Sequence, residues 1–311
     1  MPRFTLRQLE YFQTAARIGS FAGAAAELHV SATAVAAAVG DLERALGVQL
    51  CLRHKAQGIT LSTTGLWLLG EISPLLADAV EIERAVVSTD GVLRGPVAIG
   101  CYSTMAPSVI PELAAGFQAQ HPDVELTFFD GSADQLLDQL WAGRLDVVIT
   151  YRLGLPDGLD EAKLFDTGVN VLLAADHALA SASTVRLTDL AAEPFIMLDL
   201  APGGRHNLEI LSAANVTPQI RHRSSNVELV RSMVARGLGY SLLVHRPHND
   251  RSYEGLPLVS LPIGPEPVAV SAVIVWPAAV RLTRRARAVV EFAQRTLIYP
   301  PRSAQVAPRV S

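Results

Sequence analysis

Hydrophobic residues recur at helical spacing near the start of the chain and predict a first helix that ends near Ile18. Its apolar stripe consists of Leu6, Leu9, Phe12 and Ala16. Thr5 and Gln8 have the spacing of a capping box, in which each side chain accepts from the other residue's backbone. Gly19 is placed to end this helix, because glycine tolerates the left-handed conformation found there.

Two further helices follow within thirty residues. Ser20 is placed to cap a helix over about 21–29, and Ser31 to cap one over about 32–46 that Gly47 ends. One face of the third helix is apolar and should pack on the first two helices: Val35, Val39, Leu42 and Leu46. The opposite face has very small side chains: Ala32, Thr33, Ala36, Ala37 and Gly40. Such a helix fits a DNA major groove, which is about 12 Å wide.

A basic turn follows the third helix. Residues 49–55 and 58–61 predict two short extended segments around a basic turn, and Arg53, His54 and Lys55 at this turn are placed to touch phosphates. Together these elements predict a helix-turn-helix with a wing. A plain three-helix bundle remains the alternative, because alanine-rich helices occur in both.

The charge distribution favours DNA binding by this head alone. The whole chain has a formal net charge of −4, which argues against a nucleic-acid binder. Residues 1–60, however, hold six Lys/Arg and four Asp/Glu, so the head carries +2 and the remainder −6.

Residues 3–66 resemble the winged helix-turn-helix of the LysR-type transcriptional regulators. The matching segments are LRQLEYFQTAARIGSF, AAAELHVS, the Ala34-Val35 pair, LERALGVQL, Arg53 and TLSTTG. The resemblance implies that Ser31 and Thr33 begin the DNA-contacting helix and that Arg53 grips the DNA backbone. The chain departs from the family pattern with Ala32-Thr33 in place of Gln-Pro, with alanines at 36–38 in place of Ser-Arg-Gln, and with Cys51 in place of an aromatic residue. Alanine cannot donate to base edges, although it can touch a thymine methyl group.

A long helix of about 25 residues should follow, capped by Ser62 or Thr63 and bent at Pro74. Its apolar positions alternate steps of four and three: Leu68, Ile72, Leu75, Ala79, Ile82 and Val86. This heptad seam predicts pairing with a second copy of the chain, and packing on its own domain is the alternative. Residues 88–91 are typical of a hinge.

Strand and helix patterns alternate over residues 92–300 and predict parallel strands in two α/β lobes. The expected strands include 97–101, 124–129, 145–149, 169–174, 195–198, 219–223, 239–244 and 268–275. The expected helices are 107–120, 132–142, 204–214, 227–236 and 281–298, and the last strand and last helix should return to the first lobe.

This region also resembles the LysR-type effector domain, through LRGPVAIGCYSTMAPSVIPELAAGFQAQHPDVEL, LWAGRLDVVI and LVRSMVARGLGYSLL. The resemblance implies an α plus α/β chain: a winged helix-turn-helix, a linker helix, and a two-lobed domain like the type 2 periplasmic binding proteins. The expected domains are a head at 1–61, a linker and hinge at 62–90, an effector domain at 91–300 and a flexible tail at 301–311. Within the effector domain we expect lobe I at about 91–162 and 267–300 and lobe II at about 163–266.

Ligands of such sheets bind outside the carboxyl ends of the strands, where helix starts offer free N–H groups to a carboxylate. The effector-site candidates at these positions in lobe I are Ser103, Thr104, Gly131, Ser132, Thr150 and Tyr151. Arg205 and His245 are the candidates in lobe II. The family resemblance implies effector contacts at Ser103, Thr104 and Ser132, although serine and threonine at helix starts are also ordinary caps.

Other classes of function are less favoured. Only Cys51 and Cys101 are present, in different predicted domains, which indicates a reducing cytosol and leaves no thiol pair for redox sensing within the effector domain. The spacing of the histidines matches no zinc pattern, no nucleophile and base form a catalytic unit, and no segment predicts a secretory signal or a membrane span.

We therefore interpret the chain as a cytoplasmic transcription factor, without enzymatic activity, cofactor or metal. The expected partners are double-stranded DNA at a pseudo-palindromic promoter site, a small effector such as a carboxylate or aromatic acid, and further copies in a homodimer or homotetramer. The alternative is a small-molecule binding protein whose alanine-rich head has lost or weakened its sequence specificity.

Overall fold

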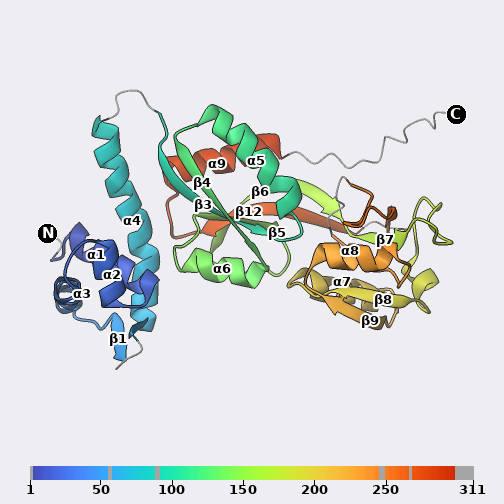
Figure 1. Ribbon diagram of the computed structural model, residues 1–311, viewed down its shortest axis with the longest axis horizontal. Coiled ribbons are helices and arrows are strands. Elements are labelled where there is room, and N and C mark those ends of the chain that lie inside the picture. Colours follow the sequence, from blue (N-terminus) through green and yellow to red (C-terminus); the bar gives the residue numbers. More distant parts are fainter. Residues whose placement is uncertain (1–2, 55–57, 88–91, 245–248, 266–267, 298–311) are drawn as a thin grey trace.

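The computed structural model describes residues 3–54, 58–87, 92–244, 249–265 and 268–297, without side chains at 53–54, 74, 77–78 and 81–87. Figure 1 shows a small helical head, the long linker helix α4 beside it, and two α/β lobes in a row. The predicted hinge at 88–91 and the predicted tail at 301–311 lie outside the described residues.

The head has the elements that its sequence predicts. They are α1 (Leu6–Ile18), α2 (Phe21–Glu27), α3 (Ala32–Leu46), β1 (Cys51–His54) and β2 (Gly58–Leu61). Thr5 and Gln8 form the predicted capping box, and Ser20 and Ser31 cap the next two helices. Gly19 and Gly47 are left-handed, with φ of 78° and 71°, so they end α1 and α3 as expected. The strands β1 and β2 pair antiparallel and form the wing.

The linker helix α4 (Thr63–Val87) has the predicted length, and Ser62 accepts a hydrogen bond from the backbone of Gly65 at its start. The structure corrects the predicted seam at its beginning, because Ile72 is buried in the core of the head and Leu68 packs against that core. The cause is the tight start of α4, where a Cβ on Gly65 would lie 2.2 Å from the Leu50 carbonyl oxygen. Leu75 is exposed, and the side chains of Ile82 and Val86 lie outside the described residues.

Lobe I contains a five-stranded sheet in the order β4-β3-β5-β12-β6. Its strands are β3 (Gly95–Tyr102), β4 (Val124–Gly131), β5 (Val147–Tyr151), β6 (Leu159–Gly168) and β12 (Ala269–Pro277). The strands β3, β4 and β5 are parallel, as predicted, whereas β12 runs antiparallel to both of its neighbours. The return of β12 to lobe I was expected, but its direction and the whole of β6 were not.

Helices cover both faces of this sheet (Figure 1). They are α5 (Ala106–Gln120), α6 (Ala133–Trp141) and α9 (Arg284–Thr296). Leu136 and Leu140 of α6 pack with Val148 on one face, while Phe117 of α5 and Phe292 of α9 pack together on the other. The alternation of side chains along β5 produces these two layers. The buried residues of α5 are Ala106, Val109, Leu113 and Phe117.

Lobe II is a second sheet with helices on both faces. It contains β7 (Asn170–Ala174), η1 (Leu187–Leu190), β8 (Pro194–Leu198), α7 (Gly203–Ala213), β9 (Gln219–Ser224), α8 (Val227–Ala235), β10 (Ser241–Leu243) and β11 (Leu258–Pro262). The order β10-β7-β11 forms one part, β8 pairs with β9, and a bridge from Phe195 to Tyr240 joins the two parts. The sequence pattern did not predict β11.

The two long strands β6 and β12 join the lobes. They remain paired as far as Gly168 and Ala269, so the chain leaves lobe I later than the expected boundary at 162. Among the described helices none is by itself long and apolar enough to span a membrane. Only the bent pair of α2 and α3 passes such a test by length and composition, and both helices contribute to the core of the head.

Candidate functional sites in the head and between the lobes

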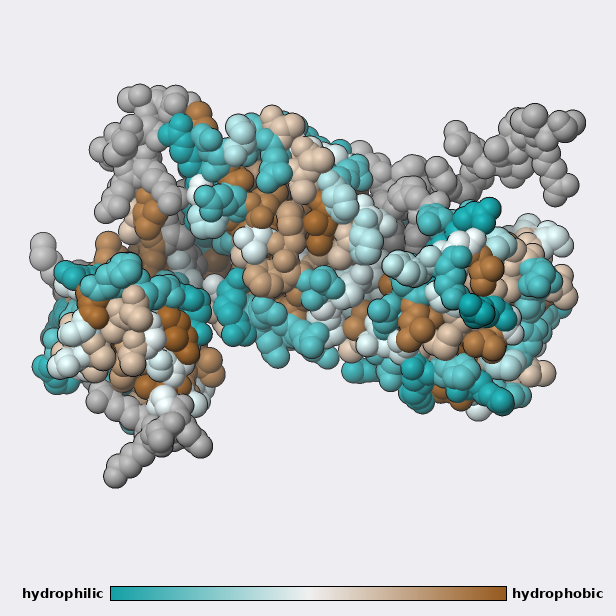
Figure 2. All heavy atoms as spheres, in the orientation of Figure 1, coloured by the Kyte–Doolittle hydropathy of each residue, from teal (hydrophilic) through white to brown (hydrophobic). Residues whose placement is uncertain are grey.

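The inner face of α3 anchors the head. Val35, Val39 and Leu42 are fully buried against Leu9 and Phe12 of α1, as predicted. Leu46, expected on this face, lies at the end of α3 and is exposed. Further hydrophobic residues reach the surface of the head on the side seen in Figure 2.

The outer face of α3 is open. Ser31, Ala32, Thr33 and Ala37 are exposed, and Ala36 is half-buried. The Ser31 hydroxyl accepts from the backbone of Ala34, 3.1 Å away, so it caps the helix from an exposed position. The sequence-predicted DNA-facing residues of α3 are therefore brought together on one accessible surface, where Thr33 contributes a side-chain hydroxyl.

Several cations of the head are already paired. Arg17 forms an ion pair with Glu27, Arg44 forms one with Asp41, and Arg7 lies 5.3 Å from the centre of the Tyr11 ring. Pairing reduces what these residues can contribute to a phosphate contact. The basic residues of the wing are therefore expected to contribute more to phosphate binding than the paired arginines of the helices.

Two contacts fix the wing to the helices. The carboxylate of Glu43 on α3 accepts from the backbone N–H groups of Leu50 and Cys51, at 2.7 and 2.9 Å. Ile59 donates to the Gly19 carbonyl at 2.8 Å. Sequence reasoning missed Glu43, because nothing in the helical pattern indicates that its carboxylate serves backbone groups beyond the helix.

Gly58 makes the second contact possible. Its φ is +84°, and a Cβ there would lie 2.3 Å from the Gly19 carbonyl oxygen. The backbones of Arg53 and His54 belong to β1, but their side chains, and all of Lys55, lie outside the described residues.

Between the lobes, the predicted lobe I residues gather at the carboxyl ends of β3 and β4. Ser103 donates its hydroxyl to Asp130, 2.9 Å away, and its backbone N–H donates to the carbonyl of Gly131. Ser132 forms a capping box with Gln135 at the start of α6. The hydroxyl oxygens of Thr104 and Tyr151 lie 3.5 Å apart. These side chains are thus engaged with their own lobe.

Thr150 and Tyr151 do not serve one site together, because successive residues of a strand point to opposite faces. Both side chains are fully buried, and Tyr151 packs on the α5 side of the sheet with its ring against Tyr102. The Thr150 hydroxyl has no hydrogen-bond partner among the described residues. Arg152, the next residue, is exposed and paired with Glu161.

The loop between β8 and α7 brings lobe II to the same place. Tyr102, the last residue of β3, donates its hydroxyl to the carbonyl of Leu200 at 2.9 Å. Ala133, the first residue of α6, donates its N–H to the carbonyl of Ala201 at 3.2 Å. Sequence reasoning did not select Tyr102, although its position at the end of a strand, beside Ser103 and Thr104, is the same signal.

The lobe II candidates are less well defined. Arg205 is exposed on α7, while the Nε2 atom of its neighbour His206 is buried without a hydrogen-bond partner in the described structure. His245 lies outside the described residues.

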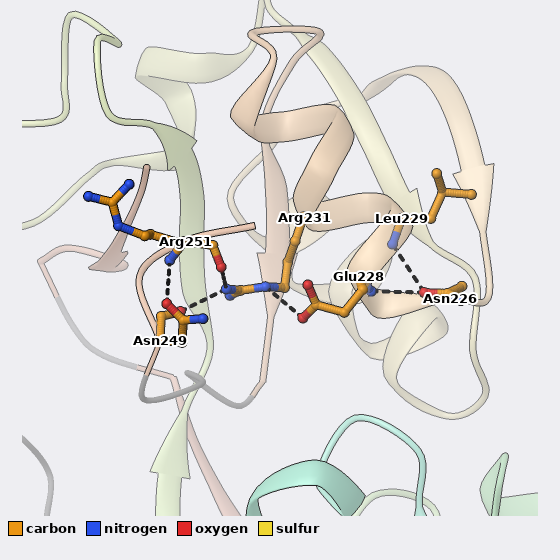
Figure 3. A network of polar contacts seen from close by, with 6 residues as sticks. All are labelled: Asn226, Glu228, Leu229, Arg231, Asn249 and Arg251. Carbon is orange, nitrogen blue, oxygen red and sulfur yellow. Dashed lines mark hydrogen bonds and ion pairs between the residues drawn. The ribbon is translucent and has the colours of Figure 1, made fainter. Parts of the chain in front are cut away.

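A buried arginine on the other helix of lobe II was also missed. Arg231 on α8 donates to the carbonyls of Asn249 and Arg251 at 2.7 and 2.6 Å, and its Nε lies 2.9 Å from Glu228 (Figure 3). It holds residues 249–251 against α8, so its role is to stabilise lobe II and not to bind a ligand.

The two cysteines are separate and buried. Cys51 belongs to the core of the head and Cys101 to the large core of the lobes. Burial raises the pKa of the Cys101 thiol, and the nearby Asp130 carboxylate raises it further. The thiol therefore stays protonated and poorly nucleophilic. Within the described residues no group of three His, Cys, Asp or Glu side chains is placed to hold a metal ion.

A cleft of about 1290 Å³ lies elsewhere, between α1, β2 and α4 on one side and lobe I on the other. Trp67 and Trp141 line it, and both are exposed. No sequence-predicted site residue is among its lining residues.

Comparison with known proteins agrees with both parts of the chain. Residues 6–66 match the model of the bacterial regulatory helix-turn-helix protein, lysR family, and residues 90–298 match the LysR substrate binding domain. The regulator CfxR of Cupriavidus necator is 34% identical over 242 residues, which are 77% of this chain and 75% of the relative. The DNA-binding transcriptional dual regulator OxyR of Escherichia coli is 29% identical over 76% of this chain and 78% of its own length.

Solved structures show the same architecture. HinK, a LysR family regulator from Pseudomonas aeruginosa, is 34% identical, with a TM-score of 0.64 over 94% of this chain and 98% of its own. A full-length OxyR variant from the same organism is 26% identical, with a TM-score of 0.75 over 94% of this chain and 95% of its own. The chain belongs to the LysR family and is a DNA-binding transcriptional regulator with a small-molecule effector domain.

Proposed function

We propose that two copies of this chain place α3 in successive major grooves of a pseudo-palindromic promoter, about one helical turn apart. The observation that carries the proposal is the outer face of α3, where Ser31, Ala32, Thr33 and Ala37 are accessible beside a firmly anchored wing. Ala36 borders this face. Because alanine offers no hydrogen bond, affinity rests mainly on phosphate contacts by Arg53, His54 and Lys55 and on DNA shape.

A mobility-shift titration of the full chain on the DNA upstream of its own gene tests this proposal. The expected result is a shift at low salt that persists in excess unrelated DNA. A shift that unrelated DNA removes completely would favour the alternative, a binding protein whose head has lost sequence specificity. Absence of any shift would overturn the DNA-binding proposal.

Dimerisation is proposed to use hydrophobic residues of α4 that the head leaves uncovered. Leu66, Trp67, Leu75 and Val80 are exposed, but Leu66 and Trp67 line the cleft towards lobe I, so Leu75 is the residue to test. Leu68 and Ile72 are used inside the head, so the pairing surface differs from the predicted seam. Leu75→Glu should shift sedimentation towards the monomer without lowering the melting temperature of the head, whereas an unchanged sedimentation coefficient would exclude Leu75 from the interface. Tetramers, usual in the family, would form through further surfaces.

The effector is proposed to be a small or aromatic carboxylic acid bound between the lobes. Ser103, Thr104, Gly131 and Ser132 line the lobe I side of the proposed site, where the Tyr151 hydroxyl lies beside that of Thr104, whereas Thr150 points to the opposite face of β5. Asp130 and Asp134 lie on this same side, so an acidic effector needs a cation from lobe II, for which Arg205 is the candidate and His245 a second.

Paired probes test this charge requirement. Thermal-shift measurements on the full chain would compare each of a panel of carboxylates, benzoate among them, with its neutral amide. Stabilisation by one or more acids, and not by the matching amides, is expected, and Arg205→Gln should remove it. Stabilisation by amides as strong as by acids would contradict the acidic class.

Peroxide sensing is a second function to weigh, because several similar proteins are hydrogen peroxide-inducible genes activators. The chain has only Cys51 and Cys101, and both are buried. Since a raised pKa disfavours the reactive thiolate of Cys101, the structure supports a bound effector over a thiol reaction. Loss of regulation in Cys101→Ser would reverse this preference.

A further inference from the structure

Tyr102 connects the two lobes through one buried hydroxyl. It ends β3 in lobe I, it is 2% exposed, and its ring meets that of Tyr151 edge-on at 5.4 Å. Its hydroxyl donates to the carbonyl of Leu200 in lobe II. The backbone of Gly203, the first residue of α7, lies next to the same oxygen, since a Cβ there would stand 3.0 Å from it. One side chain of lobe I therefore contacts both ends of the loop between β8 and α7.

A second bond crosses between the lobes through the middle of the same loop. The N–H of Ala133 donates to the carbonyl of Ala201. This N–H stands at the start of α6, where a helix has no internal partner for its first amides. The helix start that the sequence marks as a position for an effector carboxylate is thus occupied by a carbonyl of the chain itself.

The environment of Tyr102 keeps the bond in place. Burial raises the pKa of the phenol well above its ordinary value; the Gly203 backbone opposes that rise and the Asp134 carboxylate adds to it. The hydroxyl therefore keeps its proton, and can donate to Leu200, at alkaline pH values where an ordinary phenol is ionised. Gly203 fits closely, since a Cβ there would lie 3.0 Å from the Tyr102 oxygen.

We propose that Tyr102 is a latch residue, which holds lobe II against lobe I when no effector is bound. The latch consists of the Tyr102 hydroxyl with Leu200 and Gly203, and of the Ala133 N–H with Ala201. An effector that enters between the lobes has to release this loop, so the latch sets the threshold for the response. This inference rests on the proposed site between the lobes, whose regulation it describes.

Tyr102→Phe tests the latch, because it removes one oxygen and keeps the ring packing. Residue-resolved amide hydrogen exchange would be measured on the full chain without ligand. Exchange at Gly203 and at Ala133 should both rise by about tenfold, as expected for the loss of one hydrogen bond. The N–H of Ile196 donates to the backbone carbonyl of Tyr240 inside lobe II. Its exchange should not change, which would show that the lobe remains folded.

Tyr240→Phe is the matched control. Tyr240 is also fully buried, and within the described structure its hydroxyl has no hydrogen-bond partner. Its loss should leave exchange at Gly203 and Ala133 unchanged. If Tyr102→Phe raised exchange at Gly203 alone and left Ala133 protected, the Tyr102 bond would be local and the latch would be wrong.

Gly203→Ala approaches the latch from lobe II. The added methyl group presses on the Tyr102 oxygen, whereas alanine suits the helix better than glycine. Exchange at Ala133 should rise in this variant, with little further rise in the double variant with Tyr102→Phe, because both changes open one latch. Fully additive effects, or no effect of Gly203→Ala, would overturn the inference.

The exchange experiment requires neither DNA nor effector. Its result therefore tests the latch separately from the proposed function. Normal DNA shifts with unchanged exchange in Tyr102→Phe would reject the latch alone. Raised exchange at both amides in a protein that binds no DNA would support the latch and reject the DNA-binding proposal.

Discussion

On α3 of the head, Ser31, Thr33 and the neighbouring alanines point to solvent, whereas between the lobes Ser103 and Ser132 are hydrogen-bonded within their own lobe. Tyr102 and Ala133 are bonded across to lobe II. Thr33 and the alanines of the head can therefore be contacted without first breaking internal bonds, while the Ser31 hydroxyl accepts the bond that caps α3. An effector bound between the lobes, as proposed, would exchange these internal bonds for ligand bonds, and such an exchange can act as a switch.

The comparison depends first on a head whose wing is firmly packed on α1, and Gly58→Ala should disrupt this packing. The added Cβ would lie 2.3 Å from the Gly19 carbonyl oxygen at a φ of +84°, so the wing has to leave α1. We expect the head to lose about 3 kcal/mol of stability and the chain to lose DNA binding. Calorimetry should show a lower head transition with the lobe transition unchanged.

Gly40→Ala is the control for this change, because Gly40 is helical and a Cβ there meets nothing within 4 Å. It should leave the head as stable or about 0.5–1 kcal/mol more stable. Equal destabilisation by both variants would show that close packing at Gly58 is not what holds the wing.

Arg53→Ala should weaken DNA binding by about 10- to 100-fold on every sequence, since its expected contact is to phosphate. The slope of log affinity against log salt should fall by about one for each wing of the dimer. Arg44→Ala serves as the matched control because Arg44 is already paired with Asp41. A loss confined to one operator sequence would assign Arg53 to base reading.

Alkaline pH should destabilise the lobes, where buried groups keep their protons. Burial raises the pKa of Tyr240 to about 12, and burial also raises the pKa of Tyr102 and Cys101. The unfolded chain releases these protons at lower pH than the folded protein. The unfolding free energy should therefore fall as pH rises from about 9 to 12, by about 1.4 kcal/mol per pH unit for each titrating group.

Denaturant titrations at several pH values measure this fall. Tyr240→Phe should make the decline between about pH 10 and pH 12 shallower by the share of one group. If the unfolding free energy declined with pH equally steeply with and without the Tyr240 hydroxyl, groups other than Tyr240 would cause the decline.

Thr33→Ala should have the smallest effect. Thr33 is exposed on α3 and contributes one hydroxyl to a face that otherwise consists mainly of alanine. Affinity should fall by less than about threefold, while discrimination between operator and mutated operator should narrow. Competition titrations measure both. If this variant abolished binding while Arg53→Ala had no effect, the base-reading and phosphate-contacting parts of the head would be exchanged.

Sequence-based prediction was most accurate for features that depend on residues close together in the chain. Thr5, Ser20 and Ser31 cap as expected, and Gly19 and Gly47 end their helices as expected, because these contacts lie within one turn. The face of α3 that packs was also predicted, apart from Leu46 at its end.

Predictions of which surfaces pack against each other failed more often. The periodicity of α4 showed that Leu68 and Ile72 are apolar-face residues, but it could not say whether a second copy or the head covers them. Similarly, Thr150 and Tyr151 were expected to follow a strand that ends at 149, but β5 includes both as its last two residues, and alternation along the strand sends them to opposite faces.

The sequence by itself determined the family resemblance, the order of the elements apart from β6 and β11, the open alanine face and the separation of the two cysteines. Only the tertiary structure decided that Glu43 holds the wing and that Arg231 anchors residues 249–251. It also decided that Tyr102 meets a loop 98 residues further along the chain. The physical reason is that helix caps and amphipathic periods are local properties, whereas each of these polar contacts depends on how separate elements pack against one another.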